Sequence, residues 1–116
     1  KVVITDYGFP HLELETKIIT AAGAQLTSAQ CKTPEEVIAA SHDADALLVQ
    51  WAPITSQVID SLRRCKVIVR YGIGVDNVDL QAAADRGIPV CNVPDYCISE
   101  VADHTTAMSP LVFDRR

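Results

Sequence analysis

The residues best suited to chemistry are Gly72 and Gly74, which follow an apolar run at 67–69 and Arg70. A Gly-x-Gly turn between a strand and a helix leaves main-chain N–H groups unpaired and facing outward, where they bind carboxylate or phosphate oxygens. We therefore expect an anion site at Ile73 and Gly74, near the positive end of the following helix dipole. A glycine pair on its own can also mark only a tight turn.

The charged residues around this turn have two interpretations. Arg70 could contact the bound anion, or it could form a structural salt bridge with Asp76 or Glu100. Asp76 with its neighbours Asn77 and Asp79 is typical of a helix N-terminus, where such side chains cap main-chain N–H groups. No second ligand cluster accompanies these three, so no metal site is predicted.

Neither the histidines nor the cysteines form a catalytic pattern. His104 shares a helical segment with Asp103 and Glu100, which is more typical of a solvated or interdomain face than of an acid–base pair. No two cysteines have the Cys-x-x-Cys spacing of zinc or redox sites, so reduced and partly buried thiols are expected. The four cysteines are Cys31, Cys65, Cys91 and Cys97.

Composition restricts the class of protein. The chain has 116 residues, of which 48% are hydrophobic and 22% charged, as expected for one soluble globular domain. The net charge of −5 disfavours binding to nucleic acid or to an anionic membrane. No apolar run reaches the ~20 residues of a membrane span, and the N-terminus lacks a signal-peptide pattern. We therefore expect a cytoplasmic protein.

Strand-like and helix-like segments alternate along the chain, which indicates an α/β fold: a doubly wound, open, parallel five-stranded sheet with helices on both faces. Ligands of such sheets bind outside the carboxyl ends of the strands. The expected strands are 2–4, 24–29, 46–51, 67–69 and 89–93, and helices are expected from 12 to Gly23, from Thr33, over 55–62, over 80–86 and from Ser99.

The end of the chain departs from this pattern. Pro110 falls about two turns into the last helix, where it is expected to end or kink the helix. We therefore treat 108–116 as an anomalous tail and 1–107 as the domain.

Three motifs together resemble a known family: 70–79 (Arg-Tyr-Gly-Ile-Gly-Val-Asp-Asn-Val-Asp), 82–94, and Glu-Val-Ala-Asp-His at 100–104. Their order and spacing are similar to the N-terminal, substrate-side domain of the D-2-hydroxyacid dehydrogenases. Within that family the chain is most similar to the branch of D-3-phosphoglycerate dehydrogenases and C-terminal-binding proteins. The resemblance implies a flavodoxin-like domain that packs against an NAD-binding Rossmann domain, which this chain does not contain.

The resemblance also implies roles for individual residues. The reaction of the family is hydride transfer between NAD and C2 of a small 2-hydroxy or 2-keto acid. By position, the main-chain N–H groups of Ile73 and Gly74 would bind the substrate carboxylate, and Arg70 would reach into the substrate pocket. Ile73 and Val101 would lie beside the cofactor.

Two departures from the family qualify these expectations. Phosphoglycerate dehydrogenases commonly carry Arg-Ser after the third strand, whereas this chain has Gln50-Trp51. The difference argues against a phosphorylated substrate and favours a substrate whose tail, next to Trp51, is apolar or uncharged. The Arg/Glu/His catalytic trio and the Gly-x-Gly-x-x-Gly cofactor loop of the family would lie beyond residue 116. We therefore assign no catalytic residue and expect the chain to be inactive alone.

The sequence leaves several alternatives open. The cofactor could be NAD or NADP, and the full-length protein is expected to be a homodimer, as is usual in the family. The alternative function is a corepressor-like module that senses nucleotide or binds peptides, and a third is an isolated flavodoxin-like domain that binds phosphate.

Overall fold

The computed structural model describes the main chain of residues 1–113 and the side chains of residues 1–107. Five strands form one fully parallel sheet in the order β2-β1-β3-β4-β5, which is the flavodoxin-like order and confirms the predicted fold class. The strands are β1 (Val2–Ile4), β2 (Leu26–Ser28), β3 (Ala46–Val49), β4 (Val67–Arg70) and β5 (Val90–Cys91).

Each predicted helix forms, and local sequence signals set its ends. The Thr33 hydroxyl and the Glu36 carboxylate cap the start of α2 reciprocally, and main-chain N–H groups of Lys32 and Thr33 keep the pKa of Glu36 low. Gly23, at φ +77°, ends α1 as a glycine past the C-cap does. The helices are α1 (Glu13–Ala21), α2 (Pro34–Ser41), α3 (Ser56–Ser61), α4 (Leu80–Asp85) and α5 (Ile98–Phe113).

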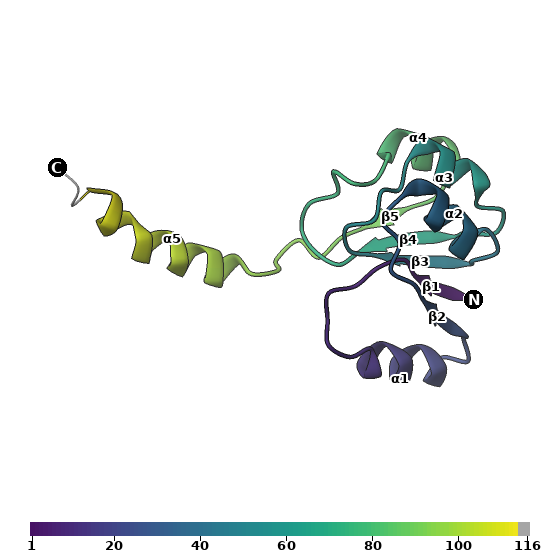
Figure 1. The fold of residues 1–116 in the computed structure, drawn as a ribbon, viewed down its shortest axis with the longest axis horizontal. Coiled ribbons are helices and arrows are strands. Elements are labelled where there is room, and N and C mark those ends of the chain that lie inside the picture. Colours follow the sequence, from purple (N-terminus) through teal and green to yellow (C-terminus); the bar gives the residue numbers. More distant parts are fainter. Residues whose placement is uncertain (114–116) are drawn as a thin grey trace.

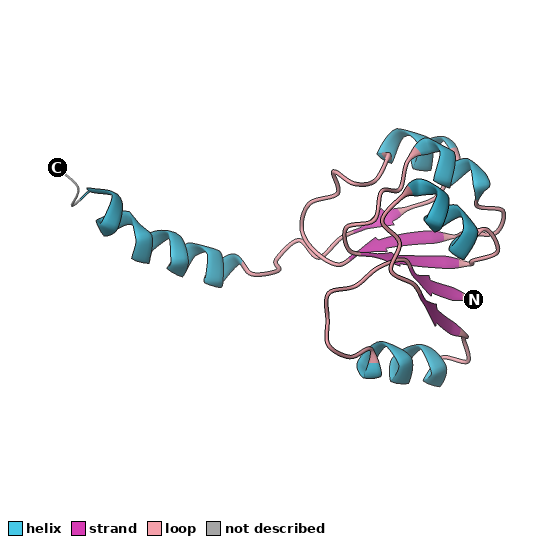
Figure 2. Ribbon diagram, in the orientation of Figure 1, coloured by secondary structure: helices cyan, strands magenta, loops and turns pink. Residues whose placement is uncertain are grey.

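The helices lie on both faces of the sheet, as predicted (Figures 1 and 2). Helices α2, α3 and α4 cover one face, and α1 alone covers the other. The chain leaves β1 for the edge strand β2 and then returns past β1 to β3. The strand order therefore reverses between β1 and β3, and the loops that follow these two strands diverge there, which opens a crevice at the carboxyl edge.

The main core lies between the sheet and α2–α4. Alternate strand residues point to this side, so Leu47 and Val49 of β3 and Ile68 of β4 are completely buried, as are Val58 and Ile59 of α3. The opposite face is covered less well, because no residue of α1 is buried and Leu14 and Ile18 remain mostly exposed. The fold is therefore stabilised mainly from one side.

Several predicted boundaries are wrong in ways that matter for the site. Strand β3 ends at Val49, two residues earlier than expected, so Trp51 lies in a loop and is 62% exposed. Strand β5 covers only two of its five predicted residues, and Cys91 within it is exposed instead of partly buried.

The last helix also differs from the prediction. It begins at Ile98, one residue before the expected N-cap Ser99, and Pro110 does not end it because the helix continues to Phe113. The rest of the predicted tail, 114–116, lies outside the described residues. Helix α5 projects away from the sheet (Figure 1). Over the described part of the chain, no helix has the length and apolar character needed to cross a membrane.

Truncation of Leu47 tests the one-sided core. Leu47 is completely buried at the centre of the sheet, so Leu47→Ala should lower the free energy of unfolding by about 2–5 kcal/mol. The matched variant Leu14→Ala, on the exposed face of α1, should change it by less than about 0.5 kcal/mol. Urea denaturation followed by circular dichroism measures both, and equal losses would contradict the proposed location of the core.

Candidate functional site

The turn after β4 presents the predicted main-chain N–H groups. Its carbonyls are held from the segment after β5, since the Val93 N–H donates to the Gly72 oxygen over 2.9 Å and the Asn92 side-chain amide donates to the Ile73 oxygen over 2.8 Å. Within residues 1–113, neither Ile73 nor Gly74 donates a main-chain hydrogen bond. Both residues are exposed, which keeps their N–H groups as candidate donors to an anion.

The helix that follows contributes less than the sequence suggested. Helix α4 begins at Leu80, six positions after Gly74, and its first turn is capped by the Asp79 carboxylate, which accepts from the Ala82 N–H over 3.0 Å. The prediction that the turn lies at the positive end of this helix dipole is therefore wrong, whereas the predicted capping role of Asp79 is confirmed. The candidate anion site therefore rests on the turn itself.

Arg70 lies directly over this turn. A Cβ atom added at Gly72 would overlap an Arg70 guanidinium nitrogen, and the Gly72 backbone has a φ of +146°. The guanidinium Nε donates to the Gln50 carbonyl over 3.0 Å and forms no ion pair with Asp76 or Glu100 among the described residues. Arg70 therefore retains donor groups and a positive charge beside the exposed N–H groups.

Arg70 and Trp51 meet in one pocket of about 270 Å³ at the carboxyl edge of the sheet. Aromatic side chains from several loops form much of its wall, so the pocket combines apolar surfaces with one cation. Its lining residues are Phe9, Gln50, Trp51, Arg70, Tyr71, Gly72, Val93 and Tyr96. Trp51 does not pack in the core, because most of its surface is exposed.

The loop after β1 supplies residues that the sequence analysis did not single out. Phe9 packs edge-on against Tyr71, with ring centroids 5.2 Å apart, and the Gly8 N–H donates to the Gln50 side chain over 2.6 Å. The carboxylate of Asp6 accepts from the main-chain N–H of Trp51. The position of this loop in the sequence could have predicted its role. The loop after a central parallel strand reaches the same edge of the sheet as the loops after β3 and β4.

Tyr71 connects α1 to this pocket. Its hydroxyl donates to the Glu15 carboxylate over 3.4 Å. Burial, together with the negative charge of Glu15, raises the pKa of Tyr71 to about 12. The neutral phenol is therefore the form that the folded domain favours.

Val101, expected beside the cofactor, is not brought to the pocket. It lies on α5, where it is 61% exposed and lines a separate hollow with His104 and Glu100. Ile73, the other predicted cofactor contact, lies within the 72–74 turn and is 45% exposed. The structure thus brings together Trp51, Arg70 and the 72–74 turn.

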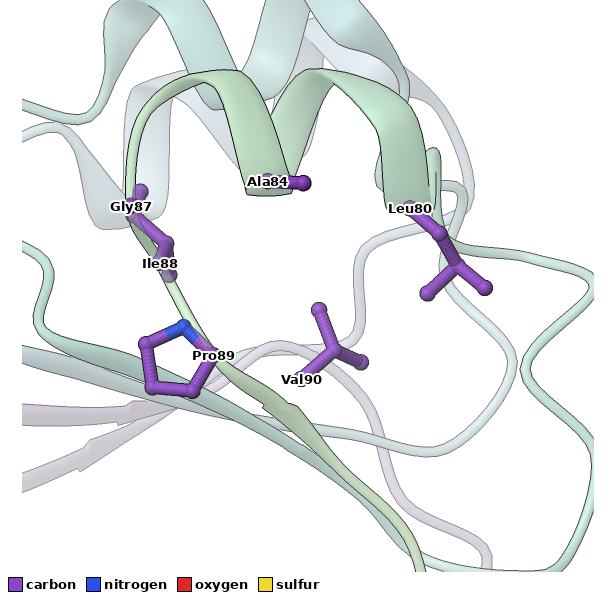
Figure 3. A pocket seen from close by; sticks show the side chains of 6 residues that line it. All are labelled: Leu80, Ala84, Gly87, Ile88, Pro89 and Val90. Atoms are coloured by element: carbon purple, nitrogen blue, oxygen red, sulfur yellow. The ribbon is translucent and has the colours of Figure 1, made fainter.

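A different and larger hollow does not qualify as a polar site. It has a volume of about 440 Å³ and lies between α4 and the start of β5, with Leu80, Ala84 and Val90 among its lining side chains (Figure 3). All six lining residues are apolar or glycine, so no side chain there can bind a charged group. This hollow lies at the start of β5, whereas the 72–74 turn follows the end of the neighbouring parallel strand β4. The two therefore lie at opposite edges of the sheet.

Substitution of Gly72 tests the contact between Arg70 and the turn. Gly72→Ala should lower stability by about 1–3 kcal/mol, because its backbone conformation is unfavourable for alanine and the new methyl group displaces the guanidinium. Gly87→Ala is the matched control, since Gly87 also has a positive φ of +67° but nothing lies within 4 Å of an added Cβ. Only Gly72→Ala should shift the Arg70 side-chain NMR signals, and unchanged signals would contradict the contact.

The pKa of Tyr71 gives a pH dependence. Because its folded pKa is raised above 10.0, its contribution to stability is complete below pH 10 and should be lost as the pH rises toward about 12. Tyr71→Phe should flatten this decline in denaturant midpoints and remove the highest step from the phenolate absorbance titration. Tyr7→Phe serves as the control, and persistence of the step in Tyr71→Phe would contradict the assignment.

Comparison with known proteins follows the same regions of the chain. The family model for the catalytic domain of D-isomer specific 2-hydroxyacid dehydrogenases matches residues 2–109. The D-3-phosphoglycerate dehydrogenases of Methanocaldococcus jannaschii and Homo sapiens are each 38% identical to this chain over 109 residues, which cover 93% of the chain. The same alignments cover 20% of each relative, so the chain spans about a fifth of their length.

Solved structures agree with this result. The NAD⁺-bound 3-phosphoglycerate dehydrogenase of Entamoeba histolytica has a TM-score of 0.81 at 27% identity, and the alignment covers 93% of this chain and 37% of that one. A protein from Thermus thermophilus has a TM-score of 0.80 at 27% identity, with 93% and 35% covered. The resemblance predicted from the three motifs is confirmed: the chain belongs to the D-isomer specific 2-hydroxyacid dehydrogenase family, as its catalytic, substrate-binding domain.

Proposed function

We propose that this chain is the substrate-side part of an NAD-dependent oxidoreductase that acts on the CH–OH group of D-2-hydroxy acids. The observation that carries the proposal is the 72–74 turn: Ile73 and Gly74 are exposed residues, and their N–H groups donate no hydrogen bond within the part of the chain that the structure describes. Two successive main-chain N–H donors could pair with the two oxygens of a carboxylate. They would hold the acid group that every 2-hydroxy acid shares.

Arg70 and Trp51 would distinguish one acid from another. The Arg70 guanidinium lies against the turn and would add a charge-assisted hydrogen bond to the bound acid. The exposed Trp51 ring and the neighbouring aromatic side chains favour an uncharged or apolar tail at C3. Gln50-Trp51 offers no cation where a phosphorylated tail would need one, so a phosphate ester is the less favoured substrate.

A nicotinamide cofactor fits the apolar groups at hand, although this chain supplies only a small part of its site. The exposed side chain of Ile73 beside the turn could contact a nicotinamide ring, and Val101 offers a second apolar surface on α5. When bound, the cofactor would accept or donate the hydride at C2. Either NAD or NADP is compatible with these two contacts, and NAD is the one bound in the Entamoeba relative.

Titration of the chain with small acids tests the proposal. Oxalate and glyoxylate should shift the main-chain amide NMR signals of Ile73 and Gly74 saturably, whereas inorganic phosphate should bind more weakly because it lacks the planar acid group. Arg70→Met should weaken oxalate binding about tenfold, the effect of one lost charge-assisted hydrogen bond. Arg64→Met is the matched control, since Arg64 pairs with Asp45 at the start of β4.

Each other result has a definite meaning. Shifts confined to other regions, or an absence of saturation, would refute the carboxylate site. Equal affinity for phosphate and oxalate would favour a phosphate-binding domain instead.

A further inference from the structure

Asp6 forms an unusual set of contacts at the crevice between β1 and β3. Its side chain is only 5% exposed, yet both carboxylate oxygens are occupied. One accepts from the Gln50 N–H over 3.1 Å and from the Thr5 hydroxyl over 2.9 Å, and the other accepts from the Trp51 N–H over 2.6 Å. A carboxylate this buried is stable only when such donors compensate for its lost hydration.

The two main-chain groups that Asp6 binds are those that carry the pocket. Trp51 supplies the aromatic wall, and the carbonyl of Gln50 accepts the hydrogen bond from Arg70 Nε over 3.0 Å. Arg70 in turn lies on Gly72. A continuous series of contacts thus runs from Asp6 through 50–51 and Arg70 to the anion-binding turn.

The same loop limits the movement of Trp51 by close packing. A Cβ added at Gly8 would lie 2.6 Å from Trp51 Cη2, so the indole ring rests directly on the Gly8 backbone. The Gly8 N–H also donates to the Gln50 side chain. Loops 5–11 and 50–53 therefore constrain each other, and Asp6 is the most buried polar contact between them.

We infer that Asp6 is a positioning residue for the substrate pocket: by binding the main chain of Gln50 and Trp51, it holds the Trp51 wall and the Arg70 guanidinium in place for the acid. Asp6 is not among the residues that line the pocket of Trp51 and Arg70, so it would act on the acid only through the groups that it positions. Its effect on binding rests on the proposed function. Its effect on Trp51 does not, and the two can be measured separately.

The first measurement uses Trp51 as its own probe, because it is the only tryptophan of the chain. In Asp6→Asn an amide nitrogen must face one of the two main-chain N–H groups, so loop 50–53 should shift. The expected result is a changed emission maximum and changed acrylamide quenching, together with shifted amide NMR signals at Gly72 and Gly74. Ser41→Ala is the matched control, since Ser41 is completely buried and donates to Val37 on the remote helix α2.

The second measurement is oxalate titration under conditions where both variants are folded. Asp6→Asn should weaken oxalate binding about tenfold, and Ser41→Ala should leave it unchanged. If Asp6→Asn has the wild-type Trp51 spectrum and the affinity of Ser41→Ala, the inference is overturned. If the wild-type chain binds no oxalate, the proposed function fails, but the Trp51 spectra still decide the role of Asp6.

A milder variant covers the case in which Asp6→Asn does not fold. Thr5→Val keeps the shape of the side chain and removes the hydroxyl that donates to Asp6. It should change the Trp51 emission in the same direction and by a smaller amount. An unchanged Trp51 spectrum in folded Thr5→Val would count against the inference.

Discussion

The hydrogen bonds to the carbonyl groups of the 72–74 turn fix the geometry on which the rest of the candidate site depends. Val93 and the Asn92 side chain bind the oxygens of Gly72 and Ile73, so the turn is fixed to the segment after β5. The N–H groups of Ile73 and Gly74, in contrast, donate no hydrogen bond among the described residues. An anion bound at this turn would meet donors on a segment that is already fixed, which would reduce the entropic cost of binding.

The position of the turn follows from the parallel sheet. Parallel strands bring all carboxyl ends to one edge, and the reversal of strand order between β1 and β3 separates the loops there. Asp6 follows β1 and Gln50 follows β3, and the hydrogen bond from the Gln50 N–H to the Asp6 carboxylate joins the two loops. The core between the sheet and α2–α4 holds the strands in place. The loops that follow these short strands can therefore maintain a defined geometry.

The fold and the position of the 72–74 turn after β4 could be predicted well from the sequence, because both depend on local signals. Alternating patterns, the Thr33 cap and the glycine pair each act within a few residues. The contacts of Asp6 with Gln50 and Trp51 join residues 44 and 45 positions apart, so no local pattern reveals them. The end of β3 was misplaced for the same reason: Gln50 and Trp51 have strand-like neighbours, but the tertiary contacts of Asp6 and Gly8 hold them in a loop.

The turn and the loop after β3 would recognise different parts of a substrate by different groups. Under the proposed function, main-chain donors of the turn would bind a carboxylate whatever the neighbouring side chains are, whereas the tail of the substrate would meet the side chains of Gln50 and Trp51. Trp51 is large and exposed, and it is held through its main-chain N–H and its contact with Gly8. A pocket built this way can change its preferred acid by substitution at residue 51 without disturbing the groups that bind the acid itself.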